Sequence, residues 1–541
     1  MFNTLIGFLK REGDFSFWKN IIFMTTLSGL SNAGLLAIVN SASNSAQKDG
    51  VNFRFFAIYI VLFLIFFITK RYSLKNAAIE IEKILKGARD RISRKIMKIE
   101  LITMENLDSS SLFTRLARDT AVISQASFQI TGAVQSVIMI FFAMIYIFTI
   151  SKIAFLLIIT ITTIITITYL SFSKEFSRTL LKVDKVEEGF LNSLTSIISG
   201  FKELKINFHK REKVLEEHMG ILNNLTNSKI KISDLFVTAI MYGEVFLYIL
   251  LAIIVFILPN LTSMDSATIT KLTAAILFII GPFGMVVTIA PMVSKTDTAI
   301  KNMYDLEEKL DISSSDTSTD ERLGEFDDFS TIKLEKVGFD YLSDRGEKLF
   351  SIGPIDMKIK KGNIIFITGG NGSGKSTLIK TLLGLYTPQR GEIQVDDKVI
   401  DKSNIQAYRN LFSIILGDFY LFDRFYGLEN VDEKLVNQLL EEMELTKSTK
   451  FIDGRFTNIN LSSGQRKRLA LILSILEDKP VYVFDEWAAD QDPEFRRYFY
   501  TKILKNLQAK GKTIVAVTHD DAYFDTADEV LKIDYGRIVK R

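Results

Sequence analysis

Six apolar stretches dominate the first 300 residues of the chain, and the polar segments between them differ greatly in length. Each stretch is long enough to cross a bilayer as a helix, which takes about 20 residues. They lie near residues 18–40, 53–69, 130–150, 153–171, 236–258 and 273–293. Basic residues precede the first stretch, as in a secretory signal peptide, but cleavage there would leave five spans. We therefore predict a membrane bundle of six transmembrane helices.

The distribution of basic residues predicts the orientation of this bundle. Residues 70–128 contain twelve Lys and Arg residues and residues 172–235 contain eleven, whereas each of the three short connections contains one. Segments that stay in the cytoplasm carry an excess of Lys and Arg. The two long segments are therefore predicted to be cytoplasmic, together with both termini and the second half of the chain.

The two long basic segments have apolar residues at helical spacing over 71–100 and 174–220, and neither contains proline. We interpret them as transmembrane helices that continue into the cytoplasm. The alternative is a pair of amphipathic helices that lie on the inner leaflet. Short helices that dock on the second half of the chain are expected near 105–120 and 200–212.

Residues 312–328 are rich in Ser, Thr and acidic residues, as is typical of a linker. Beyond them, short apolar runs alternate with helical segments, and this alternation is typical of an α/β domain. We therefore predict a membrane domain over 1–311, a linker over 312–328 and an α/β domain over 329–541.

A glycine-rich motif indicates that the α/β domain is a P-loop ATPase. A strand predicted over 364–368 leads into the sequence GGNGSGKS, and an apolar helix over 377–385 follows. This is the context that the G-x-x-x-x-G-K-S motif requires; a glycine-rich turn with an incidental lysine is the alternative. Backbone N–H groups and Lys375 are expected to bind the phosphates of ATP, and Ser376 is expected to ligate Mg²⁺. The predicted nucleotide-binding residues of this motif are Gly369, Asn371, Gly372, Ser373, Gly374, Lys375, Ser376 and Thr377.

Two acidic residues follow a second buried strand. Residues 481–484 are all apolar, and Asp485 and Glu486 come directly after them. Ligands of open α/β sheets bind at this end of the strands. Asp485 is therefore a candidate Mg²⁺ ligand, and Glu486 a candidate catalytic residue that polarises the attacking water. If these two acids stood alone, a structural role as a capping pair after the strand would be sufficient to explain them. Such a role does not explain why they occur together with a phosphate loop.

The sequence Leu461-Ser-Ser-Gly-Gln465 lies between these motifs and leads into an apolar helix. Together they resemble ATP-binding cassette (ABC) exporters of the type IV architecture, over nearly the whole chain. The signature of that family is Leu-Ser-Gly-Gly-Gln, so Ser463 replaces its first glycine. The resemblance implies a homodimer in which Ser462, Gly464 and Gln465 contact ATP held by the partner's phosphate loop.

The resemblance also implies roles for residues outside these motifs. Tyr341 matches an aromatic residue that stacks on adenine, although an ordinary strand residue is the alternative. His519 follows the strand predicted over 513–518 and matches a catalytic switch histidine that contacts the γ-phosphate. Gly417 occupies the place of a glutamine that normally reaches Mg²⁺, and the adjacent Asp418 could supply an oxygen ligand instead.

Two departures from the common family pattern resemble the cyclic-peptide, siderophore and microcin exporter subgroup. One is the run Leu416-Gly-Asp-Phe-Tyr-Leu-Phe-Asp423, and the other is Trp487, where most family members carry alanine. The subgroup implies ATP-driven export of a peptide-like substrate by alternating access. A lipid or drug flippase of the same architecture and a non-transporting ATP-gated channel or sensor remain open as alternatives.

Composition excludes several kinds of site and partner. The chain has no cysteine, which excludes disulfides, thiolate metal sites and a cysteine nucleophile. Its formal net charge is +3, but residues 1–310 carry 33 basic against 25 acidic residues and residues 311–541 carry 33 against 38. The positive excess therefore belongs to the membrane half, where it sets topology, and does not indicate a nucleic-acid partner. We expect an integral protein of a bacterial inner membrane, surrounded by lipid, with ATP and Mg²⁺ as cofactors.

Glu244 is the main candidate for chemistry within the membrane half. It lies eight residues inside the fifth apolar stretch. An ionisable group in a membrane helix costs roughly 2.5–3.5 kcal/mol on insertion scales and normally faces a cavity or a partner. Either Glu244 lines the translocation cavity and contacts polar or cationic cargo, or it lies at the inner interface of a helix that projects beyond the membrane.

Overall fold

The computed structural model describes residues 2–13, 15–49, 53–106, 112, 115–262, 264–312, 324–343, 345–428 and 431–539. The chain divides into two units, Met1–Arg94 with Asp108–Lys309 and Lys95–Leu107 with Leu310–Arg541. Residues 95–107, which the sequence placed with the membrane helices, thus belong to the second unit. There Leu101 and Ile102 pack against the hydrophobic core. Residues 313–323 of the predicted linker lie outside the described residues.

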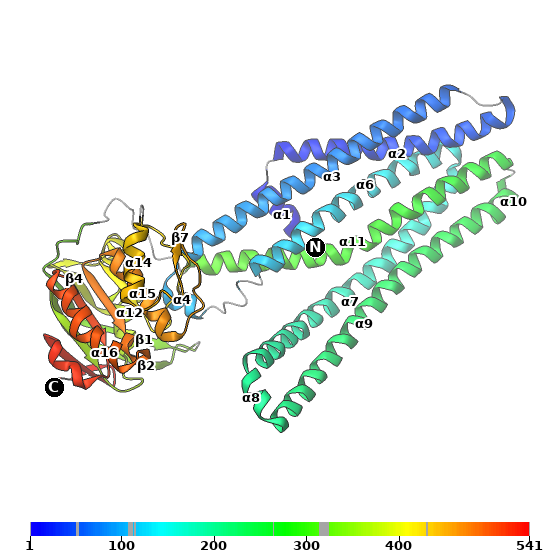
Figure 1. Ribbon diagram of the computed structural model, residues 1–541. Coiled ribbons are helices and arrows are strands. Elements are labelled where there is room, and N and C mark those ends of the chain that lie inside the picture. The colour runs from blue at the N-terminus through cyan, green and yellow to red at the C-terminus, as the bar shows by residue number, and fades with distance from the viewer. Residues whose placement is uncertain are drawn as a thin grey trace. The chain divides into compact units, whose positions relative to one another are not determined.

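The described part of the first unit is helical (Figure 1). Its helices are α1 (Phe2–Glu12), α2 (Phe15–Asp49), α3 (Phe53–Ile96), α6 (Thr120–Ile150), α7 (Lys152–Ser199), α8 (Phe201–Ile206), α9 (Phe208–Ala252), α10 (Leu258–Thr262) and α11 (Ser266–Ile312), with π-helical turns η1 (Arg115–Asp119) and η2 (Ile253–Ile257). All six predicted spans fall within these helices. Among the described residues, five helices contain a segment long and apolar enough to cross a membrane, and Lys152–Thr168 of α7 is a shorter apolar segment.

The two long basic segments begin as continuations of the predicted membrane helices, as the helical spacing predicted. α3 runs unbroken from its apolar half to Ile96, and α7 runs to Ser199. The alternative of separate amphipathic helices is therefore wrong. The short helix α8 lies within the predicted docking segment 200–212. Its counterpart α4 (Leu101–Asn106) begins before the predicted segment 105–120, of which 107–111, 113 and 114 are not described.

Packing of the bundle follows the apolar faces of the helices. α7 lies along α9, with α8 at the end of this pair, and α2 lies along α6 (Figure 1). Apolar side chains from α2, α6, α7, α9, α10 and α11 form a shared core, which includes Ile147, Ile158, Leu250 and Ile276. Some polar side chains inside the bundle pair with one another: Gln135 Nε2 donates to Ser28 Oγ at 2.8 Å. The buried Nε1 of Trp18 and hydroxyl of Tyr304 have no hydrogen-bond partner among the described residues.

The second unit is an α/β domain together with α4. Its strands are β1 (Thr331–Leu342), β2 (Lys348–Lys360), β3 (Ile364–Thr368), β4 (Arg390–Val395), β5 (Lys398–Val399), β6 (Phe412–Ile415), β7 (Phe451–Ile452), β8 (Arg455–Phe456), β9 (Val481–Asp485), β10 (Thr513–Val517), β11 (Glu529–Asp534) and β12 (Arg537–Val539). Its further helices are α12 (Lys375–Leu382), α13 (Ile405–Arg409), α14 (Glu433–Glu442), α15 (Ser463–Glu477), α16 (Pro493–Tyr498) and α17 (Leu504–Ala509), with shorter turns η4 (Trp487–Asp490), η5 (Phe499–Ile503) and η6 (Asp521–Thr526).

Two main sheets organise this domain. The first has the order β2-β1-β4-β5 and is antiparallel, and the second has the order β12-β11-β3-β10-β9-β6. In the second sheet β11, β3, β10, β9 and β6 are parallel, and β12 is antiparallel to its neighbour. β9 and β10 are buried along their whole length, which explains why they appear in the sequence as nearly continuous apolar runs. One core joins the two sheets around α12, and a second lies under α14 to α17.

Candidate nucleotide-binding site

Three neighbouring strands end at the same edge of the six-stranded sheet. Ile367 of β3 pairs with Val517 of β10, which pairs in turn with Asp485 of β9. The phosphate loop, Glu486 and His519 each follow the carboxyl end of one of these strands. They are therefore brought together, as expected for a ligand site of a parallel sheet.

The phosphate loop follows a path that requires glycine. Gly372 and Gly374 have φ values of +73° and +103°. A Cβ on Gly369 would lie 2.2 Å from the carbonyl oxygen of Ile533, so this position has no room for a side chain. Ser373 Oγ is buried without a hydrogen-bond partner among the described residues. A glycine-lined loop with a free buried donor, at the N-terminus of α12, suits a phosphate group.

Lys375 is the first residue of α12, and its side chain folds back over the loop. Nζ donates hydrogen bonds to the carbonyl oxygens of Gly369 and Gly370, each at 3.0 Å, and lies 3.8 Å from Glu486 Oε1. The side chain is 6 % exposed. The cation thus lies inside the phosphate loop and beside the candidate catalytic glutamate.

The other predicted residues of the motif occupy different environments. Asn371 and Ser376 are exposed, whereas Thr377 is buried. Thr377 Oγ1 lies 3.4 Å from the hydroxyl of Tyr341. Tyr341 is half-buried, and its ring lies near the ring of Phe350, with 6.4 Å between the centroids. The candidate adenine-stacking residue is thereby joined to the helix that follows the phosphate loop.

Asp485 is buried at the end of β9. Burial and the charge of Glu486 raise the pKa of the Asp485 carboxyl, while a backbone N–H donated by Gly417 and the charge of Lys375 act in the opposite direction. Gly417, in the place of the usual glutamine, therefore contacts Asp485 through its backbone. The charge of Asp418 raises the pKa of Asp485 further.

The donor set around Asp485 fits Mg²⁺ bound together with a nucleotide. Mg²⁺ commonly takes one or two protein oxygens and completes its octahedral shell with phosphates and water. Asp485 and the Ser376 hydroxyl provide such oxygens. Within the described part of the chain, no cluster of three His, Asp or Glu side chains forms a complete metal site. The ion would therefore depend on the nucleotide for its remaining ligands.

Glu486 and His519 are in direct contact. His519 Nε2 lies 3.2 Å from Glu486 Oε1, and both side chains are partly exposed. Glu486 has φ +48° and ψ +39°, a left-handed conformation that is unfavourable for a residue with a side chain. Its carbonyl oxygen accepts a hydrogen bond from Lys467 Nζ at 2.8 Å. Strained backbone is often held at functional sites by such surrounding contacts.

The signature residues form the first turn of α15. Ser462 caps this helix in a reciprocal arrangement with Gln465, and a Cβ on Gly464 would lie 2.6 Å from the carbonyl oxygen of Asp490. Ser462 is exposed and Gln465 is half-buried, and the backbone N–H group of each donates to the side chain of the other. For the described residues, none of the hydrogen bonds of these three positions reaches the phosphate loop.

Two further residues of the site were missed by sequence analysis. Lys467 binds the Glu486 carbonyl and pairs with Asp490 at 2.8 Å, yet it is one of several basic residues at the start of α15 and carries no distinguishing pattern. Trp487 was identified as a subgroup residue, but its position was not. It is 1 % exposed and stacks on Phe499, with 4.3 Å between ring centroids. Trp487 is therefore a core residue behind Glu486.

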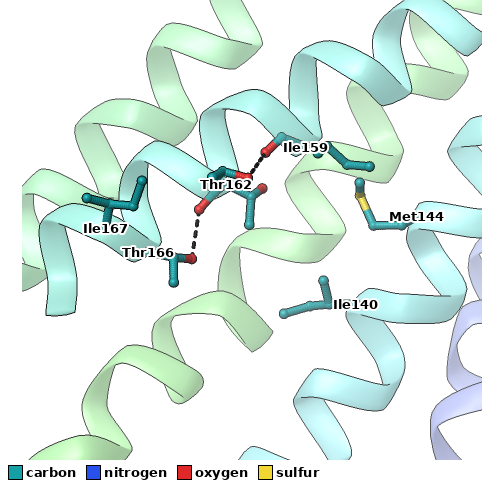
Figure 2. Close-up of a pocket in the computed structure, with 7 residues that line it drawn as sticks. Ile140, Met144, Ile159, Thr162, Thr166 and Ile167 are labelled. Atoms are coloured by element: carbon teal, nitrogen blue, oxygen red, sulfur yellow. Dashed lines mark hydrogen bonds between the residues drawn. The ribbon is translucent and has the colours of Figure 1, made fainter.

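A second candidate site is a cavity of about 330 Å³ between α6 and α7 (Figure 2). Its walls are formed by isoleucine, methionine and threonine side chains. Thr163 and Thr166 donate their hydroxyl protons to backbone carbonyls of α7, each at 2.8 Å. Glu244 is exposed on α9 and has no hydrogen bond or ion pair to the described residues.

A P-loop ATPase unit in one chain with a bundle of membrane-spanning helices defines an ATP-driven membrane transporter. The profile described as "ABC transporter" matches residues 352–489. The energy-coupling factor transporter ATP-binding protein EcfA1 of Mycoplasmopsis synoviae (strain 53) is 33 % identical over 221 residues, 38 % of this chain and 81 % of the relative. The chain belongs to the ABC transporter family.

Two other comparisons extend over both halves of the chain. "ATP-binding protein SyrD" of Pseudomonas syringae pv. syringae is 29 % identical over 534 residues, 96 % of this chain and 94 % of that protein. The structure of a bacterial Atm1-family ABC exporter with ATP bound shares the fold, with a TM-score of 0.76 and 14 % identity over 98 % of this chain and 95 % of that one. The protein is therefore an ABC transporter with fused membrane and ATPase parts and the fold of an exporter, in which ATP hydrolysis drives transport. Its ATPase domain is cytoplasmic.

Proposed function

We propose that the chain forms a homodimer that exports peptide-like cargo across a bacterial inner membrane by alternating access. In this arrangement residues 1–311 form the membrane domain and both termini are cytoplasmic. The first turn of α15, capped by the exposed Ser462, supports the dimer, because a second chain can present there the ATP that is bound to its own phosphate loop. Each of two ATP sites would then combine a phosphate loop from one chain with a signature turn from the other.

Within each site the residues have different roles in ATP hydrolysis. Lys375 and the backbone of the phosphate loop bind the β- and γ-phosphates. Glu486 orients the attacking water, and His519 holds the Glu486 carboxylate through the 3.2 Å contact. Asp485 and Ser376 would hold Mg²⁺, and the ion would supply positive charge beside the phosphates.

The cavity between α6 and α7 is the observation that carries the assignment of peptide-like cargo. Because Thr163 and Thr166 already donate their protons within α7, their free lone pairs can only accept hydrogen bonds. Apolar walls with hydroxyl acceptors complement apolar side chains and backbone N–H donors of a peptide. The walls contain no charged side chain, so a charged lipid headgroup has no counterpart there.

Glu244 supports a cationic group on that cargo. It is the single acidic residue in the six apolar stretches. An exposed carboxylate on a membrane helix requires water or a cation beside it. A cargo ammonium or guanidinium would supply that cation during transport.

Reconstitution of the full chain in liposomes tests this proposal. We expect ATP-dependent movement of cyclic peptides that is abolished by Glu486→Gln. Replacing Thr163 and Thr166 together by valine should reduce peptide transport several-fold with little change in basal ATPase activity, because each lost hydrogen bond is worth roughly 2–12-fold. Thr160→Val is the matched control, since Thr160 makes the same bond within α7, at 2.8 Å, but does not line the cavity.

Other outcomes would support the alternatives. Movement of lipid without peptide would favour a flippase, and ion currents without cargo movement would favour a channel. Glu244→Gln should reduce the transport of cationic peptides more than that of neutral peptides of equal size. If that variant leaves both transport and cargo-stimulated ATPase activity unchanged, the role of Glu244 is rejected.

A further inference from the structure

The short helix α4 is packed on the ATPase domain beside the candidate nucleotide site. Leu101 and Ile102 pack against the core that surrounds α12. One turn later, Glu105 accepts a hydrogen bond from Lys380 Nζ at 2.7 Å and another from the hydroxyl of Tyr386. Both donors belong to the segment that follows the phosphate loop. α4 therefore contacts the nucleotide-binding part of the domain directly.

Tyr386 joins this helix to Tyr341. Its side chain is 1 % exposed and stacks on Phe339, with 4.6 Å between the ring centroids. Its hydroxyl donates to Glu105 and accepts a hydrogen bond from the Tyr341 hydroxyl at 3.1 Å. Tyr341 Oη also lies 3.4 Å from Thr377 Oγ1. A chain of hydroxyl groups thus runs from the Glu105 carboxylate to the first turn after the phosphate loop.

The protonation states of Tyr386 and Lys380 determine which groups donate and which accept in this chain of hydrogen bonds. Burial and the hydrogen bond to Glu105 raise the pKa of Tyr386, so its hydroxyl keeps its proton and remains a donor. Burial lowers the pKa of Lys380, but the hydrogen bond and charge of Glu105 outweigh it and raise the pKa overall. Lys380 therefore stays charged and holds Glu105 in place.

We propose that Glu105 and Tyr386 are positioning residues that fix the Tyr341 ring for nucleotide binding, so that the affinity for ATP depends on the docking of α4. This inference rests on the adenine-stacking role proposed for Tyr341. A ring that is already oriented loses less conformational freedom when the nucleotide binds. Because α4 follows the membrane helix α3 along the chain, and because coupling between two sites is reciprocal, bound ATP would in turn stabilise docked α4.

Steady-state ATPase kinetics of the full chain in nanodiscs test the proposal. Tyr386→Phe keeps the stacked ring but removes the hydroxyl. We expect it to raise KM for Mg-ATP about threefold to tenfold, the range for one net hydrogen bond, with kcat changed less than about twofold. Tyr408→Phe is the matched control. Tyr408 is equally buried in the same core, and its hydroxyl donates instead to the Leu382 carbonyl at 2.5 Å.

Variants of α4 provide a second measurement. Glu105→Ala should raise KM as Tyr386→Phe does, and Glu105→Gln, which keeps an acceptor oxygen, should restore part of the affinity. Glu100→Ala is its control, because Glu100 also contacts the ATPase domain, through Thr387 at 3.3 Å, but lies outside the hydroxyl chain. Equal KM values for the Glu105 and Glu100 variants and the wild type would overturn the proposal.

Substitutions of Tyr341 separate failure of this inference from failure of the proposed nucleotide site. In a Tyr341→Phe background the link to Tyr386 is absent, so adding Tyr386→Phe should raise KM no further. An additive effect of the two substitutions would contradict the chain of hydroxyls. If Tyr341→Ala leaves KM unchanged, the stacking role itself is wrong. If it raises KM while Tyr386→Phe does not, only the positioning role is rejected.

Discussion

Trp487→Phe is expected to destabilise the ATPase domain and to lower its catalytic rate, although Trp487 takes no part in the chemistry. The indole stacks on Phe499 and donates its Nε1 proton to the carbonyl oxygen of Lys467 at 2.9 Å. Phenylalanine keeps the stacking but removes the donor and part of the ring. The Lys467 carbonyl then remains buried without this partner, and a small cavity opens behind Glu486.

Both effects have known magnitudes. The Lys467 carbonyl keeps its bond within helix α15, so the loss of the indole donor costs the net value of one hydrogen bond, about 0.5–1.5 kcal/mol. The lost volume adds roughly 1 kcal/mol, less than for a full truncation to alanine. The expected loss of unfolding free energy is therefore roughly 1.5–2.5 kcal/mol. In a domain of 150–250 residues each kcal/mol lowers the midpoint by about 2–4 °C, so the expected drop is roughly 3–10 °C.

Differential scanning calorimetry of the full chain in nanodiscs measures this drop, and ATPase assays well below the midpoint measure kcat. Tyr482→Phe is the control, because Tyr482 is equally buried in β9 and its hydroxyl has no hydrogen bond to the described residues. It should cost less than about 1 kcal/mol. A Trp487→Phe midpoint within about 1 °C of wild type would refute the assignment of Trp487 as a structural support of Glu486.

Two further substitutions test charged groups. Burial and the adjacent glutamate raise the pKa of Asp485, so its ionised form lowers the stability of the fold above that pKa. Without metal and nucleotide, Asp485→Asn should therefore raise the thermal midpoint at pH 7.5. Scanning fluorimetry should show that this gain shrinks as the pH is lowered. A gain that does not change with pH would contradict this origin. Arg91→Met should cost about 1–3 kcal/mol and expose α1 to protease, because Arg91 bridges the buried carboxylates of Glu12 and Glu307 at 2.8 and 2.9 Å. Arg94→Met is its control, since the fully exposed ion pair of Arg94 should contribute little stability. Equal losses for the two variants would reject the bridge.

The parts of the fold that the sequence predicted are those determined by local pattern. The strand over 364–368 coincides with β3, because four buried residues followed by a glycine-rich turn leave little choice of register. The continuation of α3 and α7 beyond their apolar segments followed from helical spacing without proline. The proximity of Glu486 and His519 followed from parallel strands that end at one edge.

The parts that were missed depend on contacts between distant segments. Glu105 and Tyr386 are separated by 281 residues, and neither lies in a motif or a periodic pattern that indicates the other. The hydrogen bond from the backbone N–H of Gly417 to Asp485 is equally hard to predict, because the sequence of a loop does not show where a glycine amide points. Side-chain chemistry suggested the carboxylate of Asp418 as the replacement for the missing glutamine. The N–H of Gly417 donates to Asp485 and supplies no oxygen, so this role of Asp418 stays a prediction.

Trp487 supports the site without acting in its chemistry. Lys467 contacts the segment after β9 in two ways, since its ammonium binds the Glu486 carbonyl and its own carbonyl accepts the Trp487 proton. Helix α15 and the left-handed backbone of Glu486 are therefore linked through Lys467. A smaller residue at 487 would remove the indole donor and leave space behind Glu486, so we expect it to act on hydrolysis through the position of Glu486.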